Sequence, residues 1–446
     1  MLAGKRKPSQ ISFTVPDLKQ NVIATRMHIE IMGVYQDACI GLDWKNVKKV
    51  SDDTSATSTV EKTYEVKADT LTQLKSMKAG SSVKLDKDVT LTEDLVIKGG
   101  SLDLNGHTLN QADNLIRVKG DVTITDSSAE KTGKITAQQY LANSMTETTI
   151  SMEKGSLTAD GVTIEGQIGN MVYYDSNICL TGLSRVSVKL TNCTLFNSTK
   201  GKNVISFAQM TKGLDLIMDK CTTENGNGIY LTNSNCDENT TITNCTLASY
   251  SQTTYKGGST VFTGNKVTGS VTLGADKLTV KDDVIEDGLT LSGKGDVTLE
   301  NVQVTKDGRR SAALNVTGSG AVTIKNGVYE NTNKRGYALG TNGYVVTIEG
   351  GYFKSAGSTV INGDAYQLPE GKVLSEVADG DYAGYYTVTD GTVEDITEPA
   401  AVIYNEDGSV AKKISDEKAA LATTFAGNGQ TVKLNKDITA EAETYY

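Results

Sequence analysis

The sequence predicts an all-β fold, a right-handed parallel β-helix, for most of its 446 residues. Three observations predict it: a short strand pattern that recurs, a shortage of proline and an abundance of glycine. The chain has four prolines, none of them between Pro16 and Pro369, and 44 glycines. Because proline cannot donate a hydrogen bond to a neighbouring strand, a long proline-free stretch suits strands that are paired on both sides. Glycine supplies the left-handed turns between such strands.

The recurring pattern is an apolar residue, a central residue that is usually threonine, and a second apolar residue. Examples are Val122-Thr-Ile124, Val162-Thr-Ile164, Val297-Thr-Leu299, Val322-Thr-Ile324 and Val346-Thr-Ile348. Successive copies recur with a period of roughly 18–28 residues. A period of this length with only short strands inside it is typical of a β-solenoid, in which coils stack into a rod.

Four parts are predicted along the chain. They are a β-rich anchoring module (1–50), a linker (51–67), the parallel β-helix with its caps (68–390), and a linker followed by the start of a second β-helix or β-rich unit (391–446). The first part alternates apolar and polar residues around Phe13 and Ile31, as half-buried strands do. The linker is a polar run without an apolar period. At roughly 24 residues per coil, the rod holds about a dozen coils.

Both ends of the predicted rod break the strand pattern. At the start, Leu71, Leu74 and Met77 share one face of a short predicted helix within residues 68–80. At the end, residues 366–390 contain a proline and a tyrosine-rich, hairpin-like run. Because the terminal strands of a stacked sheet have open edges, we expect these two segments to cap the rod.

A longer repeat connects the start of the rod with the end of the chain. Val83-Lys-Leu-Asp-Lys-Asp-Val-Thr90 returns as Val432-Lys-Leu-Asn-Lys-Asp-Ile-Thr439. Each copy follows a short predicted helix that ends in glycine, at 69–80 and 415–429. A second unit is therefore predicted to begin near residue 400.

These motifs resemble a known family of β-helix repeats. The segments Leu102-Asp-Leu-Asn-Gly-His-Thr-Leu109 and Ile348-Glu-Gly-Gly-Tyr-Phe353, together with the repeated Val-Lys-Leu start, look like the pectin-lyase-like repeats of large surface proteins in gut bacteria. Similar modules occur in fibres and spikes of phages that infect such bacteria. The resemblance covers about residues 68–446 and excludes 1–50. It implies the fold and leaves the function open.

Composition excludes some functions. A net charge of −10 argues against a nucleic-acid binder that depends on phosphate contacts. No apolar stretch approaches the roughly 18 residues of a membrane span. The segment from Met1 to Glu30 lacks the apolar run of a secretory signal, so either the protein is not exported by that route or its native start is different.

Cysteine and asparagine recur at fixed places in the coil. Cys193, Cys221 and Cys245 are spaced by about one coil each, and no histidine accompanies them. We interpret them as an interior ladder of small apolar side chains, with a metal site or redox pair as the alternative, and we expect no cofactor and no metal. A second ladder, which lines a turn and bonds from coil to coil, is predicted for Asn192, Asn244, Asn301 and Asn326.

Catalytic motifs are weak. Hydrolysis of a glycosidic bond needs two carboxylates, which on a β-helix would face outward on adjacent coils. The candidates are Asp282, Asp283, Glu300 and Glu349. Of the polygalacturonase-like set, Arg117-Val-Lys119 matches the Arg-x-Lys element, while the Asn-Thr-Asp and Gly-His-Gly elements are absent. A lyase base could come from Arg309-Arg310, but no acidic cluster surrounds that pair in the sequence. The chain is therefore not expected to be an enzyme.

Four tyrosines near the end of the rod are the candidate glycan contacts: Tyr329, Tyr337, Tyr344 and Tyr352. Tyr329 and Tyr352 are separated by about one coil, so we expect them to stack. The alternative to a sugar-binding platform is an aromatic ladder that covers the core, which we consider the better interpretation.

The resulting hypothesis is a non-catalytic fibre or decoration protein of a virion. Residues 1–50 would bind a capsid or tail protein, and the rod would reach cell-surface glycans, with a homo-oligomer such as a trimer adding avidity. The first alternative is a bacterial cell-surface adhesin or stalk. The second is a polysaccharide depolymerase, either a lyase or a glycosidase.

Overall fold

Part of the chain has a described structure. The computed structural model describes residues 13–14, 30–31, 34–35, 57–58, 70–112, 114–137, 148–169, 185–198, 202–208, 212–226, 228–233, 237–254, 257–318, 320–363, 365–390, 399–408, 410–414 and 429–435. The chain divides into two compact units, Met1–Ser76 and Met77–Tyr446.

The first unit contains two short antiparallel strand pairs. β1 (Phe13–Thr14) pairs with β4 (Thr57–Ser58), and β2 (Glu30–Ile31) pairs with β3 (Val34–Tyr35). Strand β4 lies within residues 51–67, which were predicted as a linker, and its backbone is paired with β1. The remaining residues of this predicted module and linker up to 69 lie outside the described ranges.

The predicted helix near residue 70 is present as α1 (Thr70–Lys75), in which Thr70 and Leu74 are buried. It belongs to the first unit, which ends at Ser76. Its role as a cap of the rod stays a prediction.

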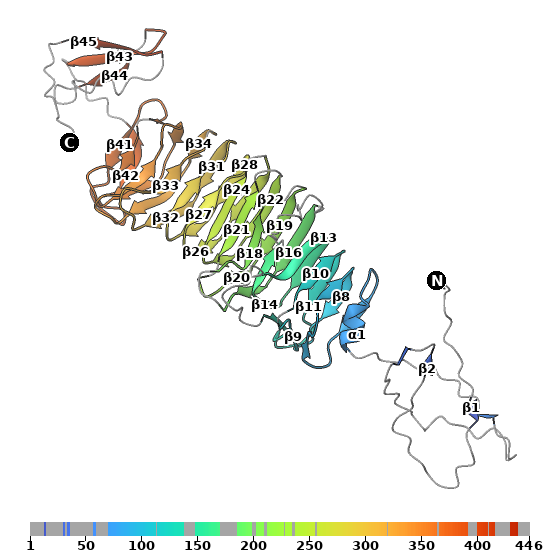
Figure 1. Ribbon diagram of the computed structural model, residues 1–446. Helices are drawn as coiled ribbons and strands as arrows, with labels where there is room; N and C mark the ends of the chain where they lie inside the picture. The colour runs from blue at the N-terminus through green and yellow to red at the C-terminus, as the bar shows by residue number, and fades with distance from the viewer. Residues whose placement is uncertain are drawn as a thin grey trace. The chain divides into compact units, whose positions relative to one another are not determined.

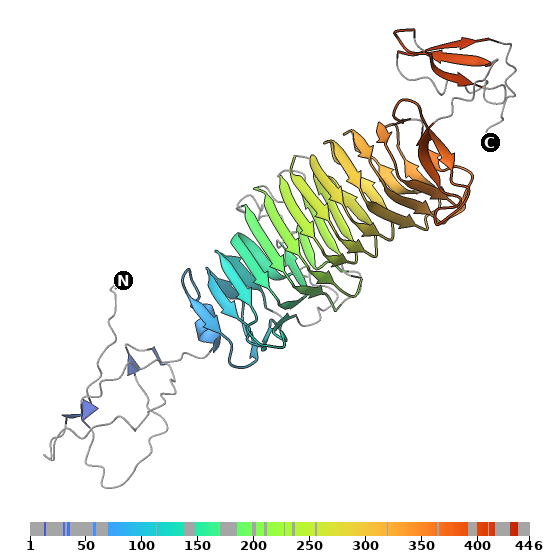
Figure 2. The same ribbon diagram turned by 180° about the vertical axis from the view of Figure 1, so that it is seen from behind.

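The second unit contains a parallel β-helix, the rod. Each coil contributes three strands, and each strand pairs in parallel with its counterpart in the next coil, so three parallel sheets run along the rod (Figures 1 and 2). We number the sheets 1, 2 and 3 in the order in which a coil meets them. The described strands β5 to β39 make twelve coils, with the long strand β13 serving sheets 3 and 1 in turn, in agreement with the predicted dozen.

The strands of the rod have the following bounds. Sheet 1 consists of β5 (Ser82–Lys84), β8 (Gly100–Asp103), β11 (Val122–Thr125), the second part of β13 (Thr148–Asp160), β16 (Val186–Thr191), β19 (Leu214–Asp219), β22 (Glu238–Thr243), β25 (Ser259–Thr263), β28 (Lys277–Lys281), β31 (Val297–Glu300), β34 (Val322–Ile324), β37 (Val346–Ile348) and β40 (Tyr366–Gln367). Sheet 2 consists of β6 (Val89–Thr90), β9 (Thr108–Asn110), β12 (Lys134–Thr136), β14 (Thr163–Glu165), β17 (Thr194–Phe196), β20 (Thr222–Thr223), β23 (Thr246–Leu247), β26 (Lys266–Val267), β29 (Val284–Ile285), β32 (Val302–Lys306), β35 (Gly327–Asn331) and β38 (Tyr352–Ser355). Sheet 3 consists of β7 (Leu95–Ile97), β10 (Ile116–Lys119), the first part of β13, β15 (Gln167–Gly169), β18 (Ile205–Ala208), β21 (Ile229–Asn233), β24 (Tyr250–Thr254), β27 (Val271–Leu273), β30 (Leu289–Leu291), β33 (Ala312–Val316), β36 (Tyr337–Gly340) and β39 (Ile361–Asn362).

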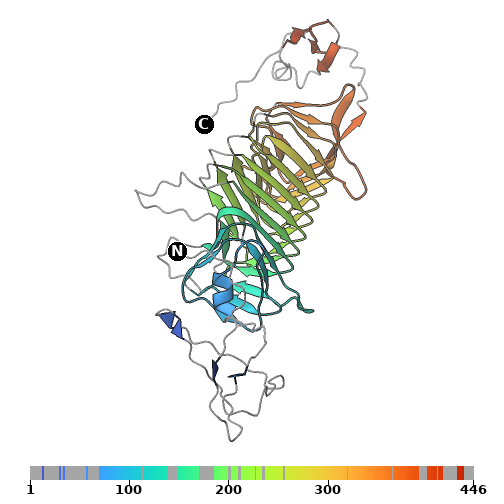
Figure 3. The same cartoon turned by 90° about the vertical axis from the view of Figure 1, so that its right-hand side faces the viewer.

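The alternation of strand side chains places one face of each sheet inside the rod. In β34, Val322 and Ile324 are buried while Thr323 is only partly covered, as the apolar-Thr-apolar pattern predicts. Ile324 is in register with Leu299 below and Ile348 above. The same alignment runs along the rod, where strands of consecutive coils lie side by side (Figure 3). The core is therefore a set of apolar columns.

The turn from sheet 1 to sheet 2 explains the asparagine ladder. Its first residue takes a left-handed backbone, with φ of +51° at Asn192, +54° at Asn244 and +55° at Asn301. Asparagine tolerates this conformation better than most residues. The amide of Asn244 donates to Asp219 at 3.0 Å, and that of Asn301 donates to Asp282 at 2.8 Å. These bonds connect successive coils, as predicted.

The next residue of this turn points into the core and forms a second column. Its members on successive coils are Cys193, Cys221, Cys245, Asn265 and Asp283. The three cysteines are buried free thiols, which confirms the interior ladder. Contact with the Cys221 sulfur, together with burial, raises the pKa of the Cys193 thiol.

Asp283 ends the polar part of this column. Its side chain is fully buried, and its Oδ1 accepts hydrogen bonds from the backbone N and the Nδ2 of Asn265, at 2.8 and 3.0 Å. Its Oδ2 has no hydrogen-bond partner among the described residues. Burial therefore raises the pKa of this carboxyl to about 7.

The end of sheet 2 is covered by an antiparallel hairpin of β41 (Lys372–Glu376) and β42 (Tyr386–Asp390), within the tyrosine-rich run. β42 also pairs antiparallel with β38, so the last parallel strand of sheet 2 has a partner on both edges. This pairing ends the parallel stacking of sheet 2, because β42 runs against the direction of the coils.

A three-stranded antiparallel sheet follows, formed by β43 (Ala401–Tyr404), β44 (Val410–Ile414) and β45 (Thr431–Leu434). The repeated Val-Lys-Leu segment is thus a strand in both places, parallel in β5 and antiparallel in β45. Most of the helix predicted at 415–429 lies outside the described residues.

Replacing Ile324 tests the register. Ile324→Asp buries a carboxylate without a partner in a packed column, and we expect a loss of about 4 kcal/mol or more of stability. Thr323→Asp, on the outward position of the same strand, is the matched control and should cost less than about 1 kcal/mol. Circular dichroism melts of both variants measure this. Equal losses would contradict the assigned register.

Asp283 makes the stability of the rod depend on pH. Its pKa is about 7 when folded and 3.8 at its usual value, so the folded chain holds the proton more tightly than the unfolded chain. The contribution of this tightly held proton to the free energy of unfolding is fully present below pH 3.8 and is lost as the pH rises through 7. The loss is on the order of 4 kcal/mol.

We therefore expect Asp283→Asn to lose less stability than the wild type between pH 5 and pH 8. Denaturant unfolding of both proteins at pH 5 and at pH 8 measures this change in the free energy of unfolding. Glu349→Gln, which removes an exposed carboxylate elsewhere on the rod, is the control and should keep the wild-type dependence. An identical pH response in the wild type and in Asp283→Asn would show that the buried carboxyl is not responsible.

Candidate functional site

The candidate catalytic carboxylates have structural roles or lie apart. Asp282 and Asp283 do not face outward together, since Asp283 is in the core. Glu300 accepts a hydrogen bond from Lys281 at 2.9 Å. Glu349 follows Ile348 two coils further on, so Glu300 and Glu349 are not on adjacent coils. This arrangement does not supply the facing pair that glycoside hydrolysis needs.

The Arg-x-Lys candidate is paired with an acid. Arg117 forms an ion pair with Glu153, and Lys119 pairs with the same carboxylate at 3.0 Å. Within the described residues, no group of three or more His, Cys, Asp or Glu side chains could hold a metal ion. None of the described helices is long and apolar enough to cross a membrane.

The four predicted tyrosines are divided between the core and the surface. Tyr329 is fully buried and stacks on Phe353, with ring centroids 5.2 Å apart and planes 13° apart. The predicted stack of Tyr329 on Tyr352 is wrong, because Tyr329 is in register with Phe353 and Tyr352 with Val328. Adjacent strand residues face opposite sides, so Tyr352 points outward. Tyr329 covers the core and cannot contact a surface glycan.

Tyr352 packs the terminal hairpin against the rod. Its ring stacks on Tyr382 with centroids 3.8 Å apart, and Tyr382 meets Tyr385 edge to face. The hydroxyl of Tyr385 donates to Glu330 at 2.7 Å, and the Nζ of Lys354 lies 4.7 Å from the Tyr385 ring. Burial and the Glu330 carboxylate raise the pKa of Tyr385. Tyr352 therefore has a structural role.

Tyr337 and Tyr344 remain as candidate contacts. Both are partly exposed. Tyr344 lies in the turn between β36 and β37, where its backbone N donates to the Thr341 carbonyl at 2.8 Å. Tyr337 is the first residue of β36 and comes directly after the loop at 332–336. That loop belongs to a network of hydrogen bonds centred on Asn331.

Two loops of equal length connect sheet 2 to sheet 3 on consecutive coils, at 307–311 and 332–336. They are aligned at both ends, since Lys306 is in register with Asn331, and Ala312 with Tyr337. The backbone N of Arg310 donates to the Arg335 carbonyl at 2.7 Å, so the loops also touch in the middle. We call them the paired loops.

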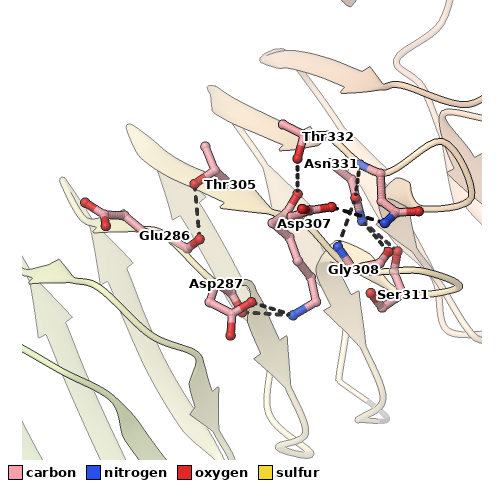
Figure 4. Close-up of polar contacts among 10 residues, drawn as sticks. Glu286, Asp287, Thr305, Asp307, Gly308, Ser311, Asn331 and Thr332 are labelled. Carbon is pink, nitrogen blue, oxygen red and sulfur yellow. Dashed lines mark hydrogen bonds and ion pairs between the residues drawn. The ribbon is translucent and has the colours of Figure 1, made fainter. Parts of the chain in front are cut away.

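Asn331 holds both paired loops (Figure 4). Its side chain is fully buried, and its Nδ2 donates to the carbonyls of Ser311 at 2.9 Å and Gly308 at 3.2 Å. Its Oδ1 accepts from the backbone N of Asn333 at 3.0 Å. One buried amide thus fixes the lower loop by two carbonyls and the upper loop by a backbone N–H.

The outer part of the network ties these loops to the coil below (Figure 4). Lys306 Nζ donates to the carbonyl and Oδ1 of Asp287, at 3.0 and 3.1 Å. Thr305 donates to the Glu286 carbonyl at 3.3 Å, and Asn333 Nδ2 to Asp307 Oδ1 at 3.1 Å. The paired loops therefore form a braced surface.

The exposed residues of the paired loops are mostly basic: Arg309, Arg310, Lys334 and Arg335. Each loop carries two of these cations next to each other in sequence, Arg309 and Arg310 in the lower loop and Lys334 and Arg335 in the upper loop. Sequence reasoning considered Arg309-Arg310 alone and missed the second pair. The available signal was the spacing, since the second basic pair follows the first at the length of one coil.

Comparison with known proteins adds no assignment: no family model, no curated protein and no solved structure matches the chain.

Asn331→Ala tests whether one buried amide holds the paired loops. The change leaves the backbone groups of Gly308 and Ser311 without their partner, at a cost of about 1–3 kcal/mol. We expect faster tryptic cleavage after Arg309, Arg310 and Arg335, measured by peptide mass spectrometry during limited digestion. Asn239→Ala, which removes a partly exposed amide in β22, is the control and should leave these sites protected. Unchanged cleavage in Asn331→Ala would contradict the bracing role.

Proposed function

We propose that this chain is a non-catalytic attachment protein of a virion, a fibre or decoration protein whose rod presents a glycan-binding surface. The observation that carries the proposal is the continuous stack of coils from β5 to β40, in which turn residues bond from coil to coil. Such a stack can hold exposed loops in a fixed arrangement along the rod. The paired loops, braced by Asn331, supply a prepared surface of this kind.

The positions of the acidic side chains support the non-catalytic part of the proposal. Asp283 is buried in the core and Glu300 is paired with Lys281, so neither is placed as a free outward carboxylate. Residues 1–50 would bind a capsid or tail protein. Assembly of several copies, for example a trimer, would let weak glycan contacts act together.

A bacterial cell-surface adhesin or stalk is the second candidate. The observation that favours it is the sequence repeat, in which Val83–Thr90 returns at 432–439 and the first residues of each copy belong to a strand. Tandem units are a common way to lengthen a stalk.

Fractionation of a producing culture separates the two candidates. Particles are purified on a density gradient away from cell envelopes, and peptides from residues 1–50 and from the rod are quantified by mass spectrometry. The virion proposal expects both sets of peptides at a fixed ratio to a capsid or tail protein. Peptides that follow the envelopes would favour the adhesin instead.

An activity assay tests whether the chain cleaves glycans. Incubation of the full chain with candidate glycans should release neither new reducing ends nor unsaturated products. Release of either would contradict the non-catalytic proposal and support the depolymerase alternative.

A further inference from the structure

The paired loops bring like charges together on adjacent coils. Arg309, Arg310, Lys334 and Arg335 are exposed, and none of the four side chains has an ion pair within the part of the chain that the structure describes. Adjacent coils are about 4.8 Å apart, so the two basic pairs lie on neighbouring loops. We call these four residues the basic ladder.

Elsewhere the rod places opposite charges on neighbouring coils. Lys281 pairs with Glu300 at 2.9 Å and Lys306 with Asp287 at 3.1 Å, each one coil apart. Like charges stacked in the same way repel one another and destabilise the fold. In a chain with a net charge of −10, a stack of four cations is a local reversal of the overall balance.

The backbone of the paired loops is braced, and the lower loop contains one acid. Asp307, the acid of the lower loop, accepts a hydrogen bond from Asn333, and the loop backbone is held by Asn331. A site whose backbone is already fixed loses less entropy when a ligand binds. Tyr337, which is partly exposed, follows shortly after Arg335 and adds an aromatic ring close in sequence to the cations.

We propose that the basic ladder binds an acidic polysaccharide through carboxylate or sulfate groups on successive sugars. Guanidinium groups bind such anions with two parallel hydrogen bonds, and three of the four ladder residues are arginine. Two rungs of cations one coil apart suit a chain with repeated charges better than a single small anion. The inference rests on the proposed attachment function and names its ligand class.

The test measures binding of the full chain to immobilised polygalacturonate, which carries carboxylates, and dextran sulfate, which carries sulfate esters. Neutral dextran and duplex DNA are the comparison probes. Arg309→Ser/Lys334→Ser removes one cation from each loop. Arg310→Asn/Arg335→Ser removes the other two while allowing the left-handed backbone at residue 310, where φ is +54°. The matched control is Lys277→Ser/Lys294→Ser, which removes two exposed lysines elsewhere on the rod.

We expect each ladder variant to bind one of the two acidic glycans about tenfold more weakly than the wild type, and the control to bind within about twofold. The glycan that responds identifies the anion as carboxylate or sulfate. Melting temperatures of the ladder variants should stay the same or rise, because repulsion is relieved. Binding to neutral dextran should be absent.

Three outcomes would overturn the inference. Equal losses in the ladder variants and the control would indicate unspecific charge attraction, and DNA binding as tight as glycan binding would indicate a general polyanion surface. Binding of wild type and ladder variants to neutral glycans alone would refute the ladder but leave the attachment function intact. The attachment function itself fails separately, if the chain follows neither particles nor envelopes in the fractionation.

Discussion

Parallel, in-register pairing between coils is the constraint on which the rest of the structure depends. Since each strand lies about 4.8 Å from its counterpart in the next coil, every residue meets the equivalent residue above and below. Ile324 therefore packs between Leu299 and Ile348, and the choice of one side chain limits the choice in the neighbouring coils. The rod is a set of columns, each with its own chemistry.

The column of Cys193, Cys221, Cys245, Asn265 and Asp283 shows how a polar group enters the core. The thiols need no strong hydrogen bonds, whereas a buried amide or carboxyl does. Asn265 meets this need by bonding to its neighbours in the column, donating to Asp283 and accepting from the backbone N of Cys245 at 2.9 Å. Asp283 has one oxygen without a hydrogen-bond partner in the described structure, which explains its raised pKa.

The sequence was informative where a column repeats at regular spacing. The buried cysteines and the left-handed asparagines could be predicted because they keep the same place in the turn from coil to coil. The pairing of Tyr329 was missed because its coil partner is Phe353, the neighbour of the tyrosine that the spacing had suggested. In a strand, such a slip to the next residue moves a side chain to the opposite face, so a proposed contact on the surface became a core residue.

The basic ladder was missed for a related reason. On sheet 2, Val284 of β29 is in register with Gln303 of β32, whereas on sheet 3 Leu289 of β30 is in register with Leu314 of β33. More residues separate the register partners on sheet 3 than on sheet 2. The loop between these two sheets is therefore longer in the coil of β32 and β33 than in the coil of β29 and β30. In the next coil the register partners are separated by the same number of residues at both ends of the loop, so the two paired loops have equal length. Loop length therefore decides where exposed groups can act together, while the columns beneath remain unchanged. A solenoid can thus acquire a binding surface by lengthening two adjacent loops equally, without any change in its core.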